Sequence, residues 1–394
     1  MLAQTRENYV ADFIGVVVVF LMAIGTVFVF SASANIGQEL NLQKFYDYPG
    51  LRQIMFFPLA CLIMYGLSHF NYRRLSLESG WHKNPTVYLM AFSIILLAIV
   101  LSQKFFPVLT RLVPEKNYHY RWLNIPLGPI SVSFQPSELA KWSTIFFLAA
   151  VCDKIGTDIK LFWKRFVPIC LLICLTVGLI IVEDFGTAAF IGLLAFLILI
   201  IAGARWWHIL TPVPFGVIAV FFGVVRSPAR MMRITAFLNP DKLSDSAAYQ
   251  ASQSLIALGS GGLFGKGLGM GICKYGHLPE DTTDFIFAII GEELGFFGNV
   301  AVILLFIAFI CLGIYVVVKC KDRFGQLLAG GIVLAIAIQA AINIGVVTVV
   351  LPTKGMPLPF VSAGGTSMLL SSAAVGILLN IARQTASKSE EIEY

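Results

Sequence analysis

The feature that most constrains this chain is a series of apolar segments, each about as long as a membrane-spanning helix. A helix needs roughly 20 apolar residues to cross the hydrocarbon core of a bilayer. Hydrophobic residues make up 58% of the chain and charged residues only 13%, whereas a soluble domain carries about 25% charged residues. The sequence therefore predicts an integral membrane protein of the all-α class.

We expect about ten spans, which makes the protein polytopic. They lie at about residues 11–34, 52–70, 86–103, 138–152, 164–182, 186–203, 206–226, 284–318, 324–350 and 365–383. An even number of spans places both termini on one side. The short loops on the other side hold only Lys44, Arg52 and Lys354, so the positive-inside rule predicts cytoplasmic termini. The first apolar run is long enough to serve as an uncleaved signal anchor.

The whole chain, 1–394, is interpreted as one membrane domain with a large extracytoplasmic loop at 227–283 and a short cytoplasmic tail at 384–394. Loops of this length without a function are uncommon. Inside the loop, residues 247–258 are typical of an amphipathic helix that leads into a glycine-rich turn. Of the seven cysteines, only Cys273 falls in a probable outside loop, which argues against a disulfide framework.

Acidic residues gather where the eighth span begins, in the segment GHLPEDTTDFIFAIIGEELGFFG. The five carboxylates are Glu280, Asp281, Asp284, Glu292 and Glu293. Ionised groups in a membrane are costly and usually mark functional sites. Asp284 can cap the helix and benefit from its dipole. It can also act as a general base at the boundary between water and lipid, and the two interpretations are compatible.

Glu292 and Glu293 follow Asp284 by eight and nine residues, roughly 12–14 Å further along a straight helix. They are either functional or part of a structural ion pair. Glu138 and Lys141 share one face of the fourth span, and Arg52 opens the second. These residues predict a polar pocket among the outer ends of the second, fourth and eighth spans.

Three outer segments carry further candidates. Arg121 and Trp122 could bind a phosphate and a sugar ring, although an interfacial aromatic belt explains Trp122 equally well. Asp184 lies between two spans. Lys354 and the pair Gly364–Gly365 fit either a cavity wall or a plain re-entrant turn. The sequence shows no Walker-type glycine loop, metal-binding histidine pair or nucleophilic triad, and no basic block that suggests nucleic acid.

Four motifs occur in a specific order: RWLN…SFQPSELAK, EDFGTA, LPEDTTDFIFAIIGEELG and NIGVVTVVLPTKGMPLPFVSAGGTS. Together they resemble the shape, elongation, division and sporulation (SEDS) family from Phe30 to Arg383. The resemblance implies ten spans with a large extracytoplasmic loop between the seventh and the eighth. FVFSASA and LPTKG are more similar to the division type than to the elongation type. Glu183 and Ala363 depart from the proline and tyrosine frequent in the family.

By resemblance, the expected activity is peptidoglycan glycosyl transfer, in which lipid II is polymerised into glycan strands. The family's essential acid falls on Asp284. A divalent cation, Mg or Mn, is a candidate cofactor, and no organic cofactor is expected. The resemblance brings five more residues into the expected substrate-binding site, Arg52, Arg121, Glu138, Lys141 and Lys354, and we assign Glu292, Glu293 and Asp184 a structural role beside it.

Expected partners are a class B penicillin-binding transpeptidase and the divisome proteins, with the chain in the bacterial cytoplasmic membrane at the division septum. Three alternatives stay open: a flippase for a lipid-linked precursor, an elongation-type polymerase, and a scaffold for a cell-wall synthase. Reconstitution with lipid II separates the first from an enzyme, because a flippase moves lipid II without polymerising it.

Overall fold

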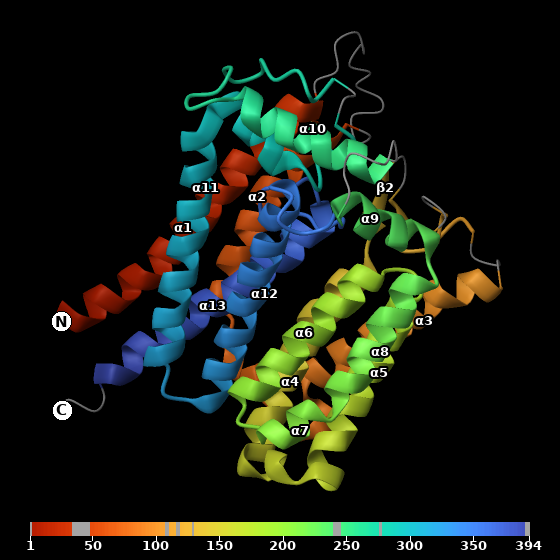
Figure 1. Ribbon diagram of the computed structural model, residues 1–394. Helices are drawn as coiled ribbons and strands as arrows, with labels where there is room; N and C mark the ends of the chain where they lie inside the picture. Colours follow the sequence, from red (N-terminus) through yellow and green to blue (C-terminus); the bar gives the residue numbers. More distant parts are fainter. Residues whose placement is uncertain are drawn as a thin grey trace.

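The computed structural model describes residues 2–33, 48–106, 110–115, 119–127, 130–238, 246–275 and 278–390. Long helices dominate it (Figure 1). Before the large loop they are α1 (Leu2–Ser33), α2 (Pro49–Ser68), α3 (Pro85–Phe105), α4 (Pro136–Ile155), α5 (Val167–Ile181), α6 (Phe185–Ile201), α7 (Trp206–Leu210) and α8 (Pro212–Val225). The loop contains α9 (Pro228–Leu238) and α10 (Ser246–Ser260), and then follow α11 (Ile286–Lys319), α12 (Arg323–Val347) and α13 (Gly365–Glu390).

The predicted polytopic, all-α architecture is confirmed, and helical structure lies at each of the ten predicted spans. In the described part of the chain, eight helical segments are long and apolar enough to cross a membrane, α7 and α8 together forming one of them. The other two are α6, which is apolar but only 17 residues long, and α4. The protein is therefore a multi-pass membrane protein.

Helix α4 lies at the centre of the bundle and carries charged residues. Every residue from Pro136 to Cys152 is buried, because α3, α6, α12 and α13 surround it. Protein rather than lipid therefore solvates its charged groups, which explains how a helix with Glu138 and Lys141 in its first two turns is accommodated.

The loops predicted to lie outside the membrane hold structure that the sequence did not predict. β1 (Leu123–Leu127) and β2 (Ile130–Phe134) form an antiparallel hairpin with Leu123 opposite Phe134. Helix α9 is also additional, whereas the amphipathic helix expected at 247–258 is present as α10. The predicted tail from residue 384 is helical up to Glu390, and residues 391–394 lie outside the described part. All seven cysteines are free thiols.

Helix α11 is not one straight helix. Gly295 has φ 71° and ψ −163° inside it, so a short helix over 286–294 ends there and the long span begins after it. This positive φ suits glycine. The backbone of residues 263–265 also lies so close that a Cβ at Gly295 would come within 2.3 Å of the Gly265 nitrogen. Glu292 and Glu293 therefore lie in this short helix, before the break, and not in the long span that follows it.

Both ends of the described chain lie on the same side of the molecule in Figure 1, at the ends of α1 and α13 that point away from α10. This arrangement agrees with an even number of spans. Helices α9 and α10 lie across the opposite ends of the bundle (Figure 1).

Candidate active site

Asp284 lies in the turn that precedes α11 and is partly buried. Phe285 is the N-cap of α11 and no side chain caps it, so the interpretation of Asp284 as a simple cap is wrong. The backbone carbonyl of Asp284 accepts a hydrogen bond of 2.8 Å from Asn343 Nδ2, which also donates to the Met356 carbonyl at 2.7 Å. Asn343 on α12 thus holds the Asp284 turn against the loop at 348–364.

The carboxylate of Asp284 faces that loop. A Cβ at Gly355 would lie 2.6 Å from Asp284 Oδ2, so only glycine leaves room for the carboxylate there. The neighbouring Lys354 donates from Nζ to the Gly186 carbonyl at 2.8 Å. A Cβ at Gly186 would in turn lie 2.2 Å from Lys354 Cε. Three segments distant in sequence therefore converge: the start of α6, the loop at 348–364 and the turn before α11.

Arg121 joins this group from the loop that precedes β1. Its Nε donates to the Glu183 carbonyl at 2.8 Å, and its Nη1 lies 3.9 Å from Asp184 Oδ2. The Asp184 carboxylate also caps α6 by accepting from the Thr187 amide at 3.0 Å. Asp184 therefore has a structural role at the helix end and a cationic neighbour at the site.

Helix α9 supplies two more cations that the sequence analysis missed. The Arg230 guanidinium lies over the Phe185 ring, 4.6 Å from its centroid, and its Nη1 donates to the Gly223 carbonyl at 2.7 Å. Burial and the positive charges of Arg121 and Arg233 lower the pKa of Arg230. The signal in the sequence was the spacing of three between Arg230 and Arg233, which puts both on one face of a helix.

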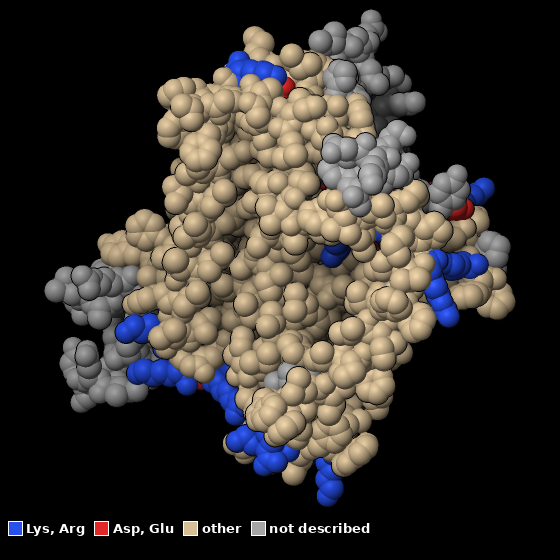
Figure 2. All heavy atoms as spheres, viewed as in Figure 1, with Lys and Arg blue, Asp and Glu red and all other residues tan. Residues whose placement is uncertain are grey.

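Burial raises the pKa of Asp284 to about 7. The negative charges of Glu280 and Asp184 contribute to this increase, and the positive charges of Arg233 and Arg121 oppose it. Burial also lowers the pKa of Lys354. Figure 2 shows a hollow near the middle of one face, with basic and acidic atoms at the edge closest to α9. The site thus combines one carboxyl group that titrates near neutral pH with several cations.

Glu138 and Lys141 lie behind this site and pair with each other. Lys141 Nζ is 2.8 Å from Glu138 Oε2 and 3.0 Å from Gln339 Oε1, and Ser367 Oγ donates to Glu138 at 2.9 Å. Gln339 Nε2 in turn donates to the Pro357 carbonyl at 2.9 Å. The pair therefore supports the loop that carries Lys354.

The sequence predicted that Glu138 and Lys141 would line a pocket shared by α4 with α2 and α11. The described contacts of Glu138 and Lys141 connect α4 with α12 and α13 instead. Arg52 is half-buried in the first turn of α2.

Glu292 and Glu293 are fully buried and pair with lysines of the glycine-rich segment after α10. Glu292 Oε1 lies 2.6 Å from Lys266 Nζ, and Glu293 Oε1 lies 2.8 Å from Lys274 Nζ. Glu293 also accepts from Ser31 Oγ at 2.8 Å. This buried ion-pair cluster links the end of α1 and the glycine-rich segment to the short helix that follows Asp284. Its members are Glu292, Glu293, Lys266, Lys274 and Ser31. The sequence suggested Arg52, Glu138 and Lys141 as partners of these two acids. Their partners are Lys266 and Lys274 instead.

Breaking this buried ion-pair cluster should destabilise the protein. We expect Glu293→Ala to lower the free energy of unfolding by about 3–5 kcal/mol, because it leaves a buried ammonium without its counter-charge. The side chain of Lys274 is only 2% exposed. Denaturant unfolding in mixed micelles measures the effect. Glu78→Ala, which removes an exposed acid, is the control and should change stability by less than about 0.5 kcal/mol. Equal stabilities of the two variants would contradict the prediction.

A divalent cation stays a prediction. Among the described residues no three His, Cys, Asp or Glu side chains form a group that could hold a metal ion. Magnesium is often held by one or two carboxylates together with phosphate oxygens of the substrate, and Asp184 is the carboxylate beside the cations that suits this arrangement. The residues fit a cation shared with a phosphate ligand rather than a cage built from protein groups alone.

The family described as cell cycle protein, which comprises FtsW, RodA and SpoVE, matches residues 12–387. A probable peptidoglycan glycosyltransferase FtsW of Geobacter metallireducens is 36% identical, over 92% of this chain and 93% of its own length. Stage V sporulation protein E of Bacillus subtilis is 37% identical, over 93% and 95%.

Solved structures share the fold. The rod shape-determining protein RodA of Thermus thermophilus has a TM-score of 0.63 and 25% identity, over 94% of this chain and 96% of that one. A chain from a peptidoglycan synthase complex has a TM-score of 0.69 and 24% identity, over 93% of this chain and 97% of that one. The chain described here therefore belongs to the FtsW, RodA and SpoVE family of cell cycle proteins.

Proposed function

We propose that this protein is a peptidoglycan glycosyltransferase that polymerises lipid II at the outer face of the cytoplasmic membrane. The observation that carries the proposal is the position of Asp284, whose carboxylate contacts Gly355, next to Lys354, and lies within the electrostatic influence of Arg121 and Arg233. Relatives named as peptidoglycan glycosyltransferases support it.

Asp284 acts as the general base in this proposal. A sugar hydroxyl is a poor nucleophile until its proton is removed, and a carboxylate with a pKa near the working pH suits that task. The acceptor oxygen attacks the anomeric carbon of the donor and forms the new glycosidic bond. The bond from that carbon to the diphosphate breaks, and the proton passes to Asp284.

The cations around Asp284 stabilise the leaving group. A polyprenyl diphosphate departs with its electron pair, so it needs charge neutralisation more than protonation. Arg121, Arg230, Arg233 and Lys354 surround the region where this charge would develop. A divalent cation near Asp184 would add to this neutralisation. Glu138 and Lys141 act indirectly by supporting the loop of Lys354.

Reconstitution tests the function. The purified chain in proteoliposomes should convert lipid II supplied on its outer side into glycan polymer, visible on a gel, with and without added magnesium. Transfer of lipid II across the bilayer without polymer would favour the flippase. Polymer made only by a co-purified second enzyme, and never by the chain alone or with its transpeptidase, would favour the scaffold.

The proposed partner is a single-span transpeptidase of the penicillin-binding class. A structural neighbour comes from a complex described as coordinating polymerization and crosslinking. We further propose cytoplasmic termini and a place at the division septum, among divisome proteins, because most of the similar relatives are named FtsW. Localisation of a fluorescent fusion to the septum or to the lateral wall separates a division role from an elongation role.

The pH dependence of polymerisation should report Asp284. Because the base acts in its ionised form, kcat/KM should fall about tenfold per pH unit below a midpoint near pH 7. Glu280 raises the pKa of Asp284, so Glu280→Gln should move this acid limb to lower pH. Glutamine can still accept the 2.9 Å hydrogen bond from Thr283 Oγ1. Glu78→Gln, a remote exposed site, should leave the profile unchanged. An unshifted limb in Glu280→Gln would contradict the assignment.

A further inference from the structure

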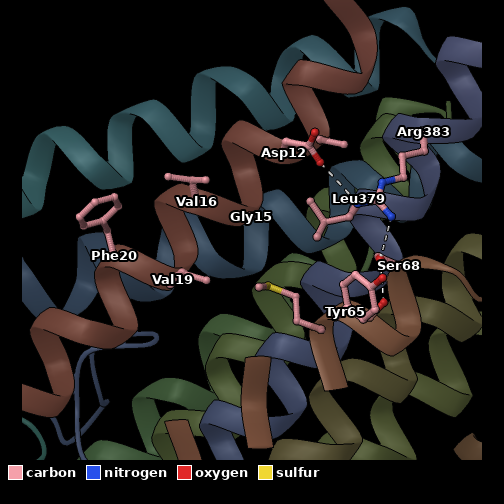
Figure 3. A pocket seen from close by; sticks show the side chains of 11 residues that line it. Asp12, Gly15, Val16, Val19, Phe20, Tyr65, Ser68, Leu379 and Arg383 are labelled. Atoms are coloured by element: carbon pink, nitrogen blue, oxygen red, sulfur yellow. Dashed lines mark hydrogen bonds and ion pairs between the residues drawn. The ribbon is translucent and has the colours of Figure 1, made fainter. Parts of the chain in front are cut away.

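A groove of about 420 Å³ lies between α1, α2 and α13, away from the candidate active site. Its volume falls within the ~300–1,000 Å³ range of ligand sites. Figure 3 shows α1 forming one wall, with Phe20 and Val16 on it, and Leu379 of α13 opposite. The floor is glycine: a Cβ at Gly15 would have only Leu379 Cδ1 within 4 Å, at 3.8 Å. The absence of a side chain at Gly15 thus keeps the groove open.

One end of the groove is polar. Arg383 on α13 donates from Nη1 to Ser68 Oγ at 3.0 Å, and its Nη2 lies 3.4 Å from Asp12 Oδ1 (Figure 3). The two charged side chains remain accessible, 32% exposed for Arg383 and 62% for Asp12. An exposed ion pair contributes little to stability, so a ligand can rearrange it at small cost.

The polarity of the groove follows the depth of the membrane. Asp12 lies near the start of the span Tyr9–Ser33, Ser68 ends α2, and Arg383 lies near the end of the span Gly365–Thr385. All three therefore lie where helices leave the hydrocarbon. From Asp12 to Phe20 the groove continues about 12 Å along α1 toward the membrane centre, and this part is apolar. A charged end at the interface and an apolar channel below it match the two parts of a phospholipid.

The charges distinguish among headgroups. The Arg383 guanidinium suits phosphate oxygens, whereas the neighbouring Asp12 carboxylate would repel a headgroup that is only anionic. A primary ammonium group, which unlike choline can donate hydrogen bonds, would satisfy Asp12. We propose that this groove binds one glycerophospholipid with a primary-amine headgroup, its phosphate on Arg383, its ammonium on Asp12 and one acyl chain along Gly15, Val16 and Phe20.

Lipid retention tests the proposal without reference to catalysis. The full chain is purified in detergent, delipidated and titrated with phosphatidylethanolamine, phosphatidylglycerol or phosphatidylcholine of identical acyl chains, and bound lipid is counted by native mass spectrometry. We expect phosphatidylethanolamine to bind about fivefold more tightly than the other two, an effect the size of one exposed ion pair. Asp12→Asn should abolish this preference, and Arg383→Gln should weaken binding of all three lipids.

A steric variant separates the groove from its charges. Gly15→Leu fills the channel and leaves Asp12 and Arg383 in place, so it should lose retained lipid. Gly178→Leu is the matched control, because its glycine lies on exposed α5 surface with no atom within 4 Å of an added Cβ. Equal binding of the three lipids by the wild type, a preference for phosphatidylglycerol, or undiminished lipid on Gly15→Leu would each overturn the proposal. The wild-type comparison holds even if a variant fails to fold.

Discussion

Replacing Asp284 by asparagine should abolish most lipid II polymerisation while the protein still folds and inserts. General base catalysis contributes about 10²–10⁴-fold to a rate. We therefore expect the turnover of purified lipid II to fall by about 10²-fold or more. Asparagine keeps the size of the side chain but cannot accept the proton. Burial already disfavours the ionised carboxylate, so the substitution should not lower thermal stability.

The neighbouring Asp281→Asn is the control for this experiment. It removes an acid three residues away and should keep most of the activity. A second probe leaves Asp284 intact but crowds it: Gly355→Ala places a methyl group against Oδ2, whereas Gly364→Ala meets only Ser367 Cβ at 3.5 Å. Turnover by Asp284→Asn close to the wild-type value would remove the base from the mechanism.

The second large effect is expected at Lys354. Lys354→Met keeps the length of the side chain and removes its charge, so the leaving diphosphate loses one stabilising cation. Removal of a single group that stabilises developing charge costs about 10²–10³-fold in kcat. We expect a decrease of that size in single-turnover polymerisation. Lys354→Arg restores a positive charge and should recover part of the rate.

Lys160→Met, which neutralises an exposed lysine in the turn after α4, should leave polymerisation unchanged. If Lys354→Met lost no more activity than Lys160→Met, the cation at position 354 would have no part in the departure of the diphosphate. If Lys354→Met lost activity only through a raised KM, with kcat unchanged, Lys354 would bind the donor without stabilising the transition state.

The ten spans could be predicted because hydropathy is a local property that needs no knowledge of neighbours. Asp284, Arg121 and Lys354 could be singled out because each lies near the predicted outer end of a span and falls in a motif of the family. Their convergence depends on Asn343 and Gly186, whose contacts cross more than 50 residues of sequence. No local pattern reports such contacts.

The ion pairs of Glu292 and Glu293 show the same limit. Lys266 and Lys274 precede them by 26 and 19 residues, a spacing with no helical or strand periodicity. The break at Gly295 was equally hidden, because an isolated glycine is tolerated within a helix and its φ is not visible in the sequence. Arg230 and Arg233 had a signal in their spacing, but α9 itself was not predicted.

The break at Gly295 also has a mechanical consequence. Since the backbone there packs against residues 263–265, we expect the part of α11 after Gly295 to be able to tilt without moving the Asp284 turn. A protein that binds the lipid-exposed side of this helix would then leave Asp284 undisturbed. We expect a regulator of Asp284 to act instead through the glycine-rich segment or the end of α1, which contact the short helix after Asp284.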